Sequence, residues 1–225
     1  MTDFSWSQLL AMDWVEIGEA GLDTLIMLSV SLVFTVLLGL PLGILLYLSA
    51  PGQLRARPRL YASLSLLVNV LRSLPFVILL IVLIPFTLLL VGTSIGVAGA
   101  IVPLVVGAVP FYARLVENVL REVDRGVIEA SQAMGACLSQ IIFKVLLPES
   151  LPGLIGAATV TAVALVSYTA MSGVIGGGGL GDLAVRYGYQ RFQTEVMVVT
   201  VALLLMLVQL LQSAGDALVR RFRFD

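Results

Sequence analysis

The sequence contains no histidine, and it has only one cysteine and one lysine among its 225 residues. Histidine is the commonest general base and metal ligand in proteins, so its absence removes the usual centre of either chemistry. The lone cysteine, Cys137, offers neither a disulfide within the chain nor a metal cluster. A phosphate-binding P-loop needs Gly-Lys-Ser/Thr, whereas Lys144 follows Phe143. We therefore expect a chain that is not an enzyme and that binds no cofactor or metal ion itself.

Charged residues are also scarce: 12% of the sequence is charged and 59% is hydrophobic, with a mean hydropathy of +1.05. Soluble domains are about half apolar and about a quarter charged, so this composition predicts a protein embedded in a bilayer. No acidic residue lies deep inside an apolar run, which disfavours a proton- or sodium-driven carrier because such carriers use buried acids. With a pI of about 5.4 and no basic surface outside the loops, nucleic acid is not an expected partner.

Long apolar runs predict an all-α, polytopic membrane protein with five transmembrane helices. Residues 73–113 form an uncharged run of 41 residues, which as a helix measures roughly 60 Å. Because the hydrocarbon core is about 30 Å thick, this run contains parts of two spans, with a break at Pro85–Ser94. Gly39 and Gly43, one helical turn apart, favour close helix packing over a hinge. The expected spans cover residues 22–48, 61–85, 95–113, 152–175 and 196–215 of a single transmembrane domain, residues 1–225.

The distribution of basic residues predicts the orientation of the chain. With five crossings, ten of the 13 lie on one side: Arg55, Arg57, Arg59, Arg114, Arg121, Arg125, Lys144, Arg220, Arg221 and Arg223. The first 23 residues contain five acidic residues and no basic one. Since positive residues stay cytoplasmic, the N-terminus is expected outside and the C-terminus in the cytoplasm. The missing basic stretch before the first apolar run also argues against a cleaved signal peptide.

A polar loop near residues 124–148 lies on the expected cytoplasmic side. Asp124–Gly126 predicts a turn, and Val127–Met134 can form two helical turns that end at Gly135, because glycine adopts positive φ at little cost. Glu129 suits the positive end of the helix dipole. One flank of the helix is nearly bare, because alanines recur at helical spacing: Ala130, Ala133 and Ala136. Two roles fit such a helix: docking in a groove of a partner protein, or capping the bundle as an amphipathic interfacial helix.

The loop reads Glu129-Ala130-Ser131, three residues, Gly135, nine residues, Val145, Leu146 and Leu147-Pro148. This spacing resembles the EAA loop of ABC-importer permeases, with Ser131 in place of the last alanine and Val145 in place of isoleucine. The resemblance implies a type I ABC-importer permease fold and a coupling helix that docks on a separate ATPase subunit, which binds ATP and Mg. The implied docking residues are Glu129, Ala130, Ser131, Ala133, Gly135 and Pro148.

The resemblance extends from about Gly18 to Val219 and is closest to the methionine permeases of bacterial ABC importers. The matching stretches include Asn69–Phe76, Gly92–Gly96, Arg114–Asn118, Ala170–Gly173 and Gly176–Gly181. It implies an inner-membrane homodimer with an alternating-access pore on the two-fold axis, two ATP-binding subunits and an external substrate-binding protein. Import of another small amino acid is the nearer alternative, and a passive channel or membrane scaffold is the more distant one.

Two residues are candidates for the transport pathway. Arg72 lies about twelve residues into its expected span, as a pathway or subunit-contact residue or as a structural arginine bound to backbone carbonyls that Pro75 exposes. Met171 precedes the glycine-rich segment Gly173–Gly179, which is expected to form an irregular turn and not a phosphate loop. If the fourth span lines the axis, two Met171 side chains would form a flexible, apolar gate. The alternative is a methionine that faces lipid or packs inside the chain.

Overall fold

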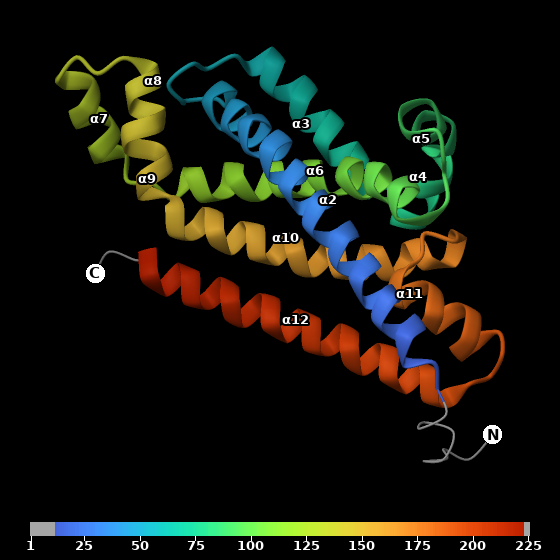
Figure 1. Ribbon diagram of the computed structural model, residues 1–225. Coiled ribbons are helices and arrows are strands. Elements are labelled where there is room, and N and C mark those ends of the chain that lie inside the picture. Colours follow the sequence, from blue (N-terminus) through green and yellow to red (C-terminus); the bar gives the residue numbers. More distant parts are fainter. Residues whose placement is uncertain (1–11, 223–225) are drawn as a thin grey trace. The chain divides into compact units, whose positions relative to one another are not determined.

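Every regular element in the computed structural model, which describes residues 12–222, is helical. Four helices are long: α2 (Trp14–Ser49), α6 (Gly96–Arg121), α10 (Leu151–Ser172) and α12 (Thr194–Phe222) (Figure 1). Within the described residues these four are long and apolar enough to cross a membrane, and a bent pair of shorter helices makes a fifth if it is counted as one span. This agrees with the predicted all-α fold with five spans.

The second predicted span, residues 61–85, is not one helix. It is divided into α3 (Pro58–Ser73) and α4 (Phe76–Val82), which meet at an angle of 103°. Pro75 between them is extended, with φ −58° and ψ 131°. Its ring nitrogen has no hydrogen to donate to the helical ladder, and the ring disfavours a helical conformation at the preceding residue, Leu74. The second predicted span is therefore interrupted at Pro75, a break that the sequence did not predict.

The expected break at Pro85–Ser94 is only partly correct. Pro85 lies in the first turn of α5 (Ile84–Val91), where proline costs no helical hydrogen bond, so it begins a helix and does not end one. The helix ends instead at Gly92, whose φ of 78° is accessible to glycine. The chain between Gly92 and the start of α6 is therefore the irregular part of this region.

The other predicted spans are mostly shorter than the helices that contain them. α2 begins before residue 22, α6 continues past residue 113, and α12 continues past residue 215. The predicted spans end at charged residues, but long charged side chains near the end of a membrane helix extend toward water without ending the helix. The fourth span, residues 152–175, matches α10 together with its terminal 3₁₀ turn, Gly173–Ile175.

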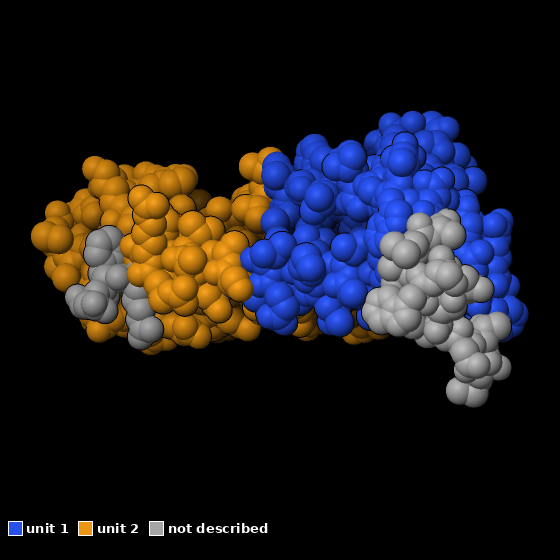
Figure 2. All heavy atoms as spheres, turned by 60° about the horizontal axis from the view of Figure 1, so that its bottom comes forward, with its two compact units in different colours: residues 1–34, 74–107, 162–212 blue, residues 35–73, 108–161, 213–225 orange. Residues whose placement is uncertain are grey.

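Contacts divide the chain into two units, each built from three segments (Figure 2). One unit contains residues 1–34, 74–107 and 162–212, and the other contains residues 35–73, 108–161 and 213–225. The four long helices α2, α6, α10 and α12 each contribute residues to both units, and the single transmembrane domain stays a prediction. We call the first unit 1 and the second unit 2.

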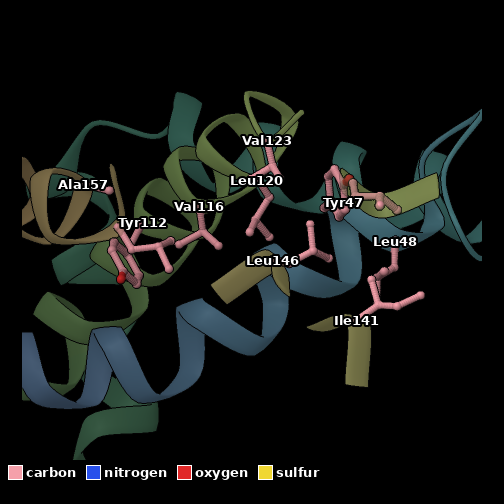
Figure 3. Packing of buried hydrophobic residues seen from close by; sticks show 11 residues of the cluster. Tyr47, Leu48, Tyr112, Val116, Leu120, Val123, Ile141, Leu146 and Ala157 are labelled. Atoms are coloured by element: carbon pink, nitrogen blue, oxygen red, sulfur yellow. The ribbon is translucent and has the colours of Figure 1, made fainter. Parts of the chain in front are cut away.

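The core of unit 2 joins the end of α2 to α6 and to the segment that follows α6 (Figure 3). Its buried members are Tyr47, Leu48, Tyr112, Val116, Leu120, Val123, Ile128, Ile141, Leu146, Leu154 and Ala157. Gly39 and Gly43 allow α2 to approach α6 closely. A Cβ added at Gly39 would lie 2.8 Å from Tyr112 Cδ1, and one added at Gly43 would lie 2.5 Å from Val116 Cβ. The predicted close packing is confirmed. Such packing matters in a bilayer, where lipid tails are as apolar as the side chains and contact area drives association.

In unit 1, the glycine-rich segment after α10 forms an irregular turn, as predicted. It leads through Gly176 and Gly178, both with positive φ, into α11 (Gly179–Leu183) and the π-helical η3 (Ala184–Tyr189). The turn packs directly on α2: the backbone N–H of Leu180 donates to Thr24 Oγ1 at 2.9 Å. The glycines therefore serve close backbone approach.

Candidate functional site

The polar loop after α6 contains three short helices and a π-helical turn in unit 2. They are α7 (Arg125–Ala133), α8 (Leu138–Ile141), η1 (Ile142–Leu146) and α9 (Leu147–Glu149) (Figure 1). At the start of α7, the Asp124 carboxylate accepts from the backbone N–H of Gly126 at 2.7 Å. This N-cap satisfies a backbone donor that has no partner inside the helix. The predicted turn at Asp124 therefore also begins the candidate coupling helix.

Gly135 ends α7 as predicted. Its φ is 79°, the Gly135 N–H donates to Gln132 O at 2.9 Å, and the Ala136 N–H donates to Ser131 O at 3.1 Å. This pair of bonds satisfies carbonyls in the last turn of the helix. It requires a left-handed backbone conformation, with positive φ, at Gly135. The chain then turns into α8, whose first residues follow Cys137.

The two sides of α7 differ in exposure. Ile128 and Ser131 are buried, whereas Glu129, Ala130 and Ala133 are exposed. The Ser131 hydroxyl donates to Val127 O at 2.8 Å, so serine in place of alanine is satisfied within the helix. Ile128, which belongs to the buried cluster of unit 2, packs α7 against its own chain. The exposed flank consists of Glu129, Ala130, Gln132, Ala133 and Met134.

Pro148, the last residue of the motif, belongs to α9 and not to α7. It is exposed and is separated by Leu147 alone from the wider π-helical turn η1. Proline cannot donate to the carbonyl four residues earlier, so a locally widened ladder before it is the expected response. Pro148 therefore lies in the short helix that immediately precedes α10.

A buried charge cluster at the end of α6 was not anticipated. The Glu117 side chain is 1% exposed and forms ion pairs with Arg114 and Arg121, the latter at 2.7 Å. The Tyr61 hydroxyl of α3 donates to the same carboxylate at 3.1 Å. The predicted third span ends before Glu117, and the sequence predicts no role of its own for this residue. The spacing of three and four residues in Arg114, Glu117 and Arg121 is the signal that could have identified the cluster.

The two candidate pathway residues lie in different units, and each is described within its own unit. Arg72 of unit 2 is exposed and lies in the last turn of α3, with its guanidinium carbon 5.8 Å from the centroid of the Phe111 ring. A cation near a helix C-terminus and over an aromatic ring is favourable. Because the helix ends at Ser73, Arg72 is not in the middle of a continuous span. Met171 of unit 1 is 43% exposed in the last turn of α10.

A cavity of about 480 Å³ lies in unit 1 beside the N-terminal end of α2. Its described lining is Met12, Asp13, Glu16, Ile17, Leu183, Tyr187, Phe192, Gln193, Glu195 and Val196. Glu16 accepts from the Tyr187 hydroxyl at 3.0 Å and from Arg186 at 3.4 Å. These contacts join α2 to η3, which follows the glycine-rich turn.

The sequence profile of the family described as "Binding-protein-dependent transport system inner membrane component" matches residues 39–224. The chain belongs to this family. The match includes α6, α7, α10 and α12, and therefore the whole candidate coupling segment. The chain is accordingly a multi-pass inner-membrane permease component.

Individual relatives and solved structures agree with the family. The probable D-methionine transport system permease protein MetI of Vibrio cholerae is 51% identical over 199 residues, 88% of each chain. The methionine import system permease protein MetP of Bacillus subtilis is 51% identical over 172 residues, 76% of this chain and 78% of that one. A solved structure of the MetNI methionine ABC transporter in an inward-facing conformation matches with a TM-score of 0.92 at 49% identity, over 98% of this permease and 100% of that chain. The type I importer fold predicted from the sequence is confirmed.

Proposed function

We propose that this permease is the membrane-spanning subunit of an ATP-driven methionine importer. It works as a homodimer with a pore on the two-fold axis, two ATP-binding subunits and an external substrate-binding protein. The observation that carries the proposal is α7, a capped helix with an exposed alanine flank, in a chain 51% identical over 199 residues to a probable D-methionine permease. Its N-terminus is external and its C-terminus cytoplasmic, which places α7 on the side where ATP is hydrolysed.

Coupling follows from how α7 is held. Ile128 belongs to the same buried cluster as Leu120 of α6, Leu146 of η1 and Leu154 of α10. Close-packed side chains transmit displacement because they have little free volume to absorb it. When an ATP-binding subunit moves α7, the adjoining ends of α6 and α10 therefore move with it. ATP and Mg²⁺ bind to the partner subunit, and this chain contributes the docking helix and the pore.

The gate is assigned to Met171, close to the external end of α10. Its side chain is 43% exposed in the single chain and is therefore available to a second copy. A thioether chain is apolar and has three rotatable bonds, so two copies can exclude water yet yield to a passing solute. Arg72, exposed at the bend between α3 and α4, is the second candidate for contact with the pathway or the other subunit.

Methionine is favoured over another small amino acid because relatives from Vibrio cholerae and Bacillus subtilis, each 51% identical, are named as methionine permeases. A solved amino acid ABC transporter with a TM-score of 0.79 is only 17% identical and supports the fold alone. A passive channel or membrane scaffold would give the exposed flank of α7 no part in transport.

The test is uptake of radiolabelled methionine into vesicles that contain the purified permease. We expect uptake only when the ATP-binding subunit, ATP and the external binding protein are all present. Glu129→Lys is expected to reduce uptake strongly, while the matched variant Glu122→Lys, also exposed but outside α7, retains it. Equal uptake without ATP would identify a passive channel. If another amino acid competes efficiently and D- and L-methionine do not, the assignment of methionine as the substrate is wrong.

A further inference from the structure

A groove of about 440 Å³ lies in unit 2 between the turn after α2 and the segment α7–α8. The described residues that line it are Leu54, Arg55, Gln132, Ala136, Leu138 and Ile141. Arg55 is exposed, and it is the single charged residue in this described lining, which contains no carboxylate. The groove thus combines two polar side chains that can donate hydrogen bonds with four apolar side chains.

Both walls of the groove are ordered. The turn after α2 folds back on the helix end: the Arg55 N–H donates to Leu48 O at 3.2 Å, and the Arg57 N–H donates to Ser49 O at 2.9 Å. Leu54 from this turn and Leu138 from α8 pack against the same buried cluster. Arg55 is therefore presented at a fixed position relative to α7, although it is far from α7 in the sequence.

The groove continues the exposed flank of α7, because Gln132 belongs to both. A partner that covers Glu129, Ala130 and Ala133 therefore lies next to the groove. A guanidinium binds a carboxylate through two parallel N–H donors, and the Gln132 amide can supply another donor. The absence of a carboxylate from the described lining leaves Arg55 available to a carboxylate from outside.

We propose that this groove is a second docking site for the ATP-binding subunit. In it, Arg55 and Gln132 bind a carboxylate side chain of that subunit, while Leu54, Leu138 and Ile141 contact its aliphatic part. This inference rests on the proposed function, in which α7 docks on that subunit. Two attachment points fix the rotation of α7 as well as its position, so the second contact improves the transmission of movement.

The test is the affinity of the purified ATP-binding subunit for the permease in lipid nanodiscs. Arg55→Glu is expected to weaken binding by about tenfold, a change of about 1.4 kcal/mol, because it places two carboxylates together. Arg55→Lys should weaken binding less than Arg55→Glu, because the positive charge remains although the two-donor geometry is lost. The matched control is Arg59→Glu, which changes net charge equally but lies outside the groove lining. It should bind like the unaltered protein.

A charge exchange identifies the partner group. An Asp→Arg or Glu→Arg change in the ATP-binding subunit should restore binding to Arg55→Glu while weakening binding to the unaltered permease. If Arg55→Glu and Arg59→Glu lose affinity equally, and only in nanodiscs with anionic lipid, the basic turn binds lipid head groups and the groove proposal is wrong. It is also wrong if Arg55→Glu binds normally. If the unaltered permease does not bind the ATP-binding subunit at all, the proposed function fails with it.

Discussion

Individual residues in the coupling segment have separable tasks. Gly135 supplies a backbone conformation, Ile128 packs α7 against the buried cluster of its own chain, and Glu129 with Ala130 forms part of the exposed flank. Only the last two are available for direct contact with a partner. A substitution at Gly135 therefore tests whether the turn that ends α7 matters, and a substitution at Glu129 tests the exposed flank of α7.

Replacing Gly135 with valine is expected to uncouple ATP hydrolysis from uptake. The φ of 79° is strained for a β-branched residue and costs on the order of 1 kcal/mol or more, so the end of α7 should reorganise. Uptake and ATP hydrolysis are measured together in vesicles. Gly92→Val is the matched control, since Gly92 has a φ of 78° and equal space around it but lies outside the coupling segment. Normal coupling in Gly135→Val would remove the role assigned to this turn.

The rate at which the Cys137 thiol, between α7 and α8, reacts with a labelling reagent should depend on pH. It is exposed, and a hydrogen bond from Ser139 lowers its pKa because the hydroxyl stabilises the thiolate. At neutral pH, below the ordinary thiol pKa, the thiolate fraction is therefore raised, and maleimide labelling should be faster than in Ser139→Ala. The advantage should disappear at a pH above both pKa values, where both thiols are ionised. A rate ratio that does not vary with pH would contradict this. Docking of the ATP-binding subunit should slow labelling in both proteins.

Helices α3 and α6 are joined by polar contacts as well as by apolar packing. Glu117 of α6 receives hydrogen bonds from Tyr61 of α3 and from two arginines of its own helix, and Arg114 also donates to Ser65 Oγ at 2.8 Å and to Asn69 Oδ1 at 2.9 Å. The cluster lies just before α7 in the sequence. It therefore fixes the helix end to which the coupling segment is attached.

Glu117→Gln is expected to destabilise the permease by about 1–3 kcal/mol, because it leaves Arg114 and the more exposed Arg121 without their buried counter-charge. The measurement is the thermal unfolding midpoint of the purified protein in detergent. Glu122→Gln removes the same charge from an exposed position near the end of α6 and should change the midpoint little. Equal midpoints for the two variants would show that the cluster adds nothing to the α3–α6 connection.

The whole protein is expected to span the membrane with its basic turns and tail on one side. A reporter fused at the C-terminus should be cytoplasmic, and one inserted before Trp14 should be external, because basic loops remain in the cytoplasm. Enzymatic reporters that are active on only one side of the membrane measure this directly. An N-terminus in the cytoplasm would mean that one span is miscounted and that α7 is on the wrong side for coupling.

The proposed homodimer brings two copies of Met171 to the axis. Met171→Cys, in a Cys137→Ser background, is expected to form an intersubunit disulfide readily without nucleotide and less when the ATPases are trapped with ATP, because closing the cytoplasmic side opens the external one. The bond should block transport until it is reduced. Val174→Cys, exposed one turn later, is the comparison position. Crosslinking at Val174 but not at Met171 in every nucleotide state would make Met171 an ordinary packing residue.

The sequence by itself determined the membrane environment, the helical class and the coupling motif. These follow from local chemistry: apolar length fixes the spans, a positive-φ glycine ends α7, and the spacing from Glu129 to Pro148 identifies the loop. The glycine-rich turn after α10 and the close packing at Gly39 were predictable for the same reason.

The tertiary structure decided what depends on partners distant in the sequence. Pro75 and Pro85 are the same residue type in one apolar run, yet the first bends the chain and the second starts a helix, because their places relative to the helix ends differ. Burial of Ser131 and Glu117 depends on neighbours supplied by packing, as does the approach of Arg55 to Gln132 across the groove. Periodicity within one segment cannot specify which other segment will cover it, and that choice is made only when the helices pack.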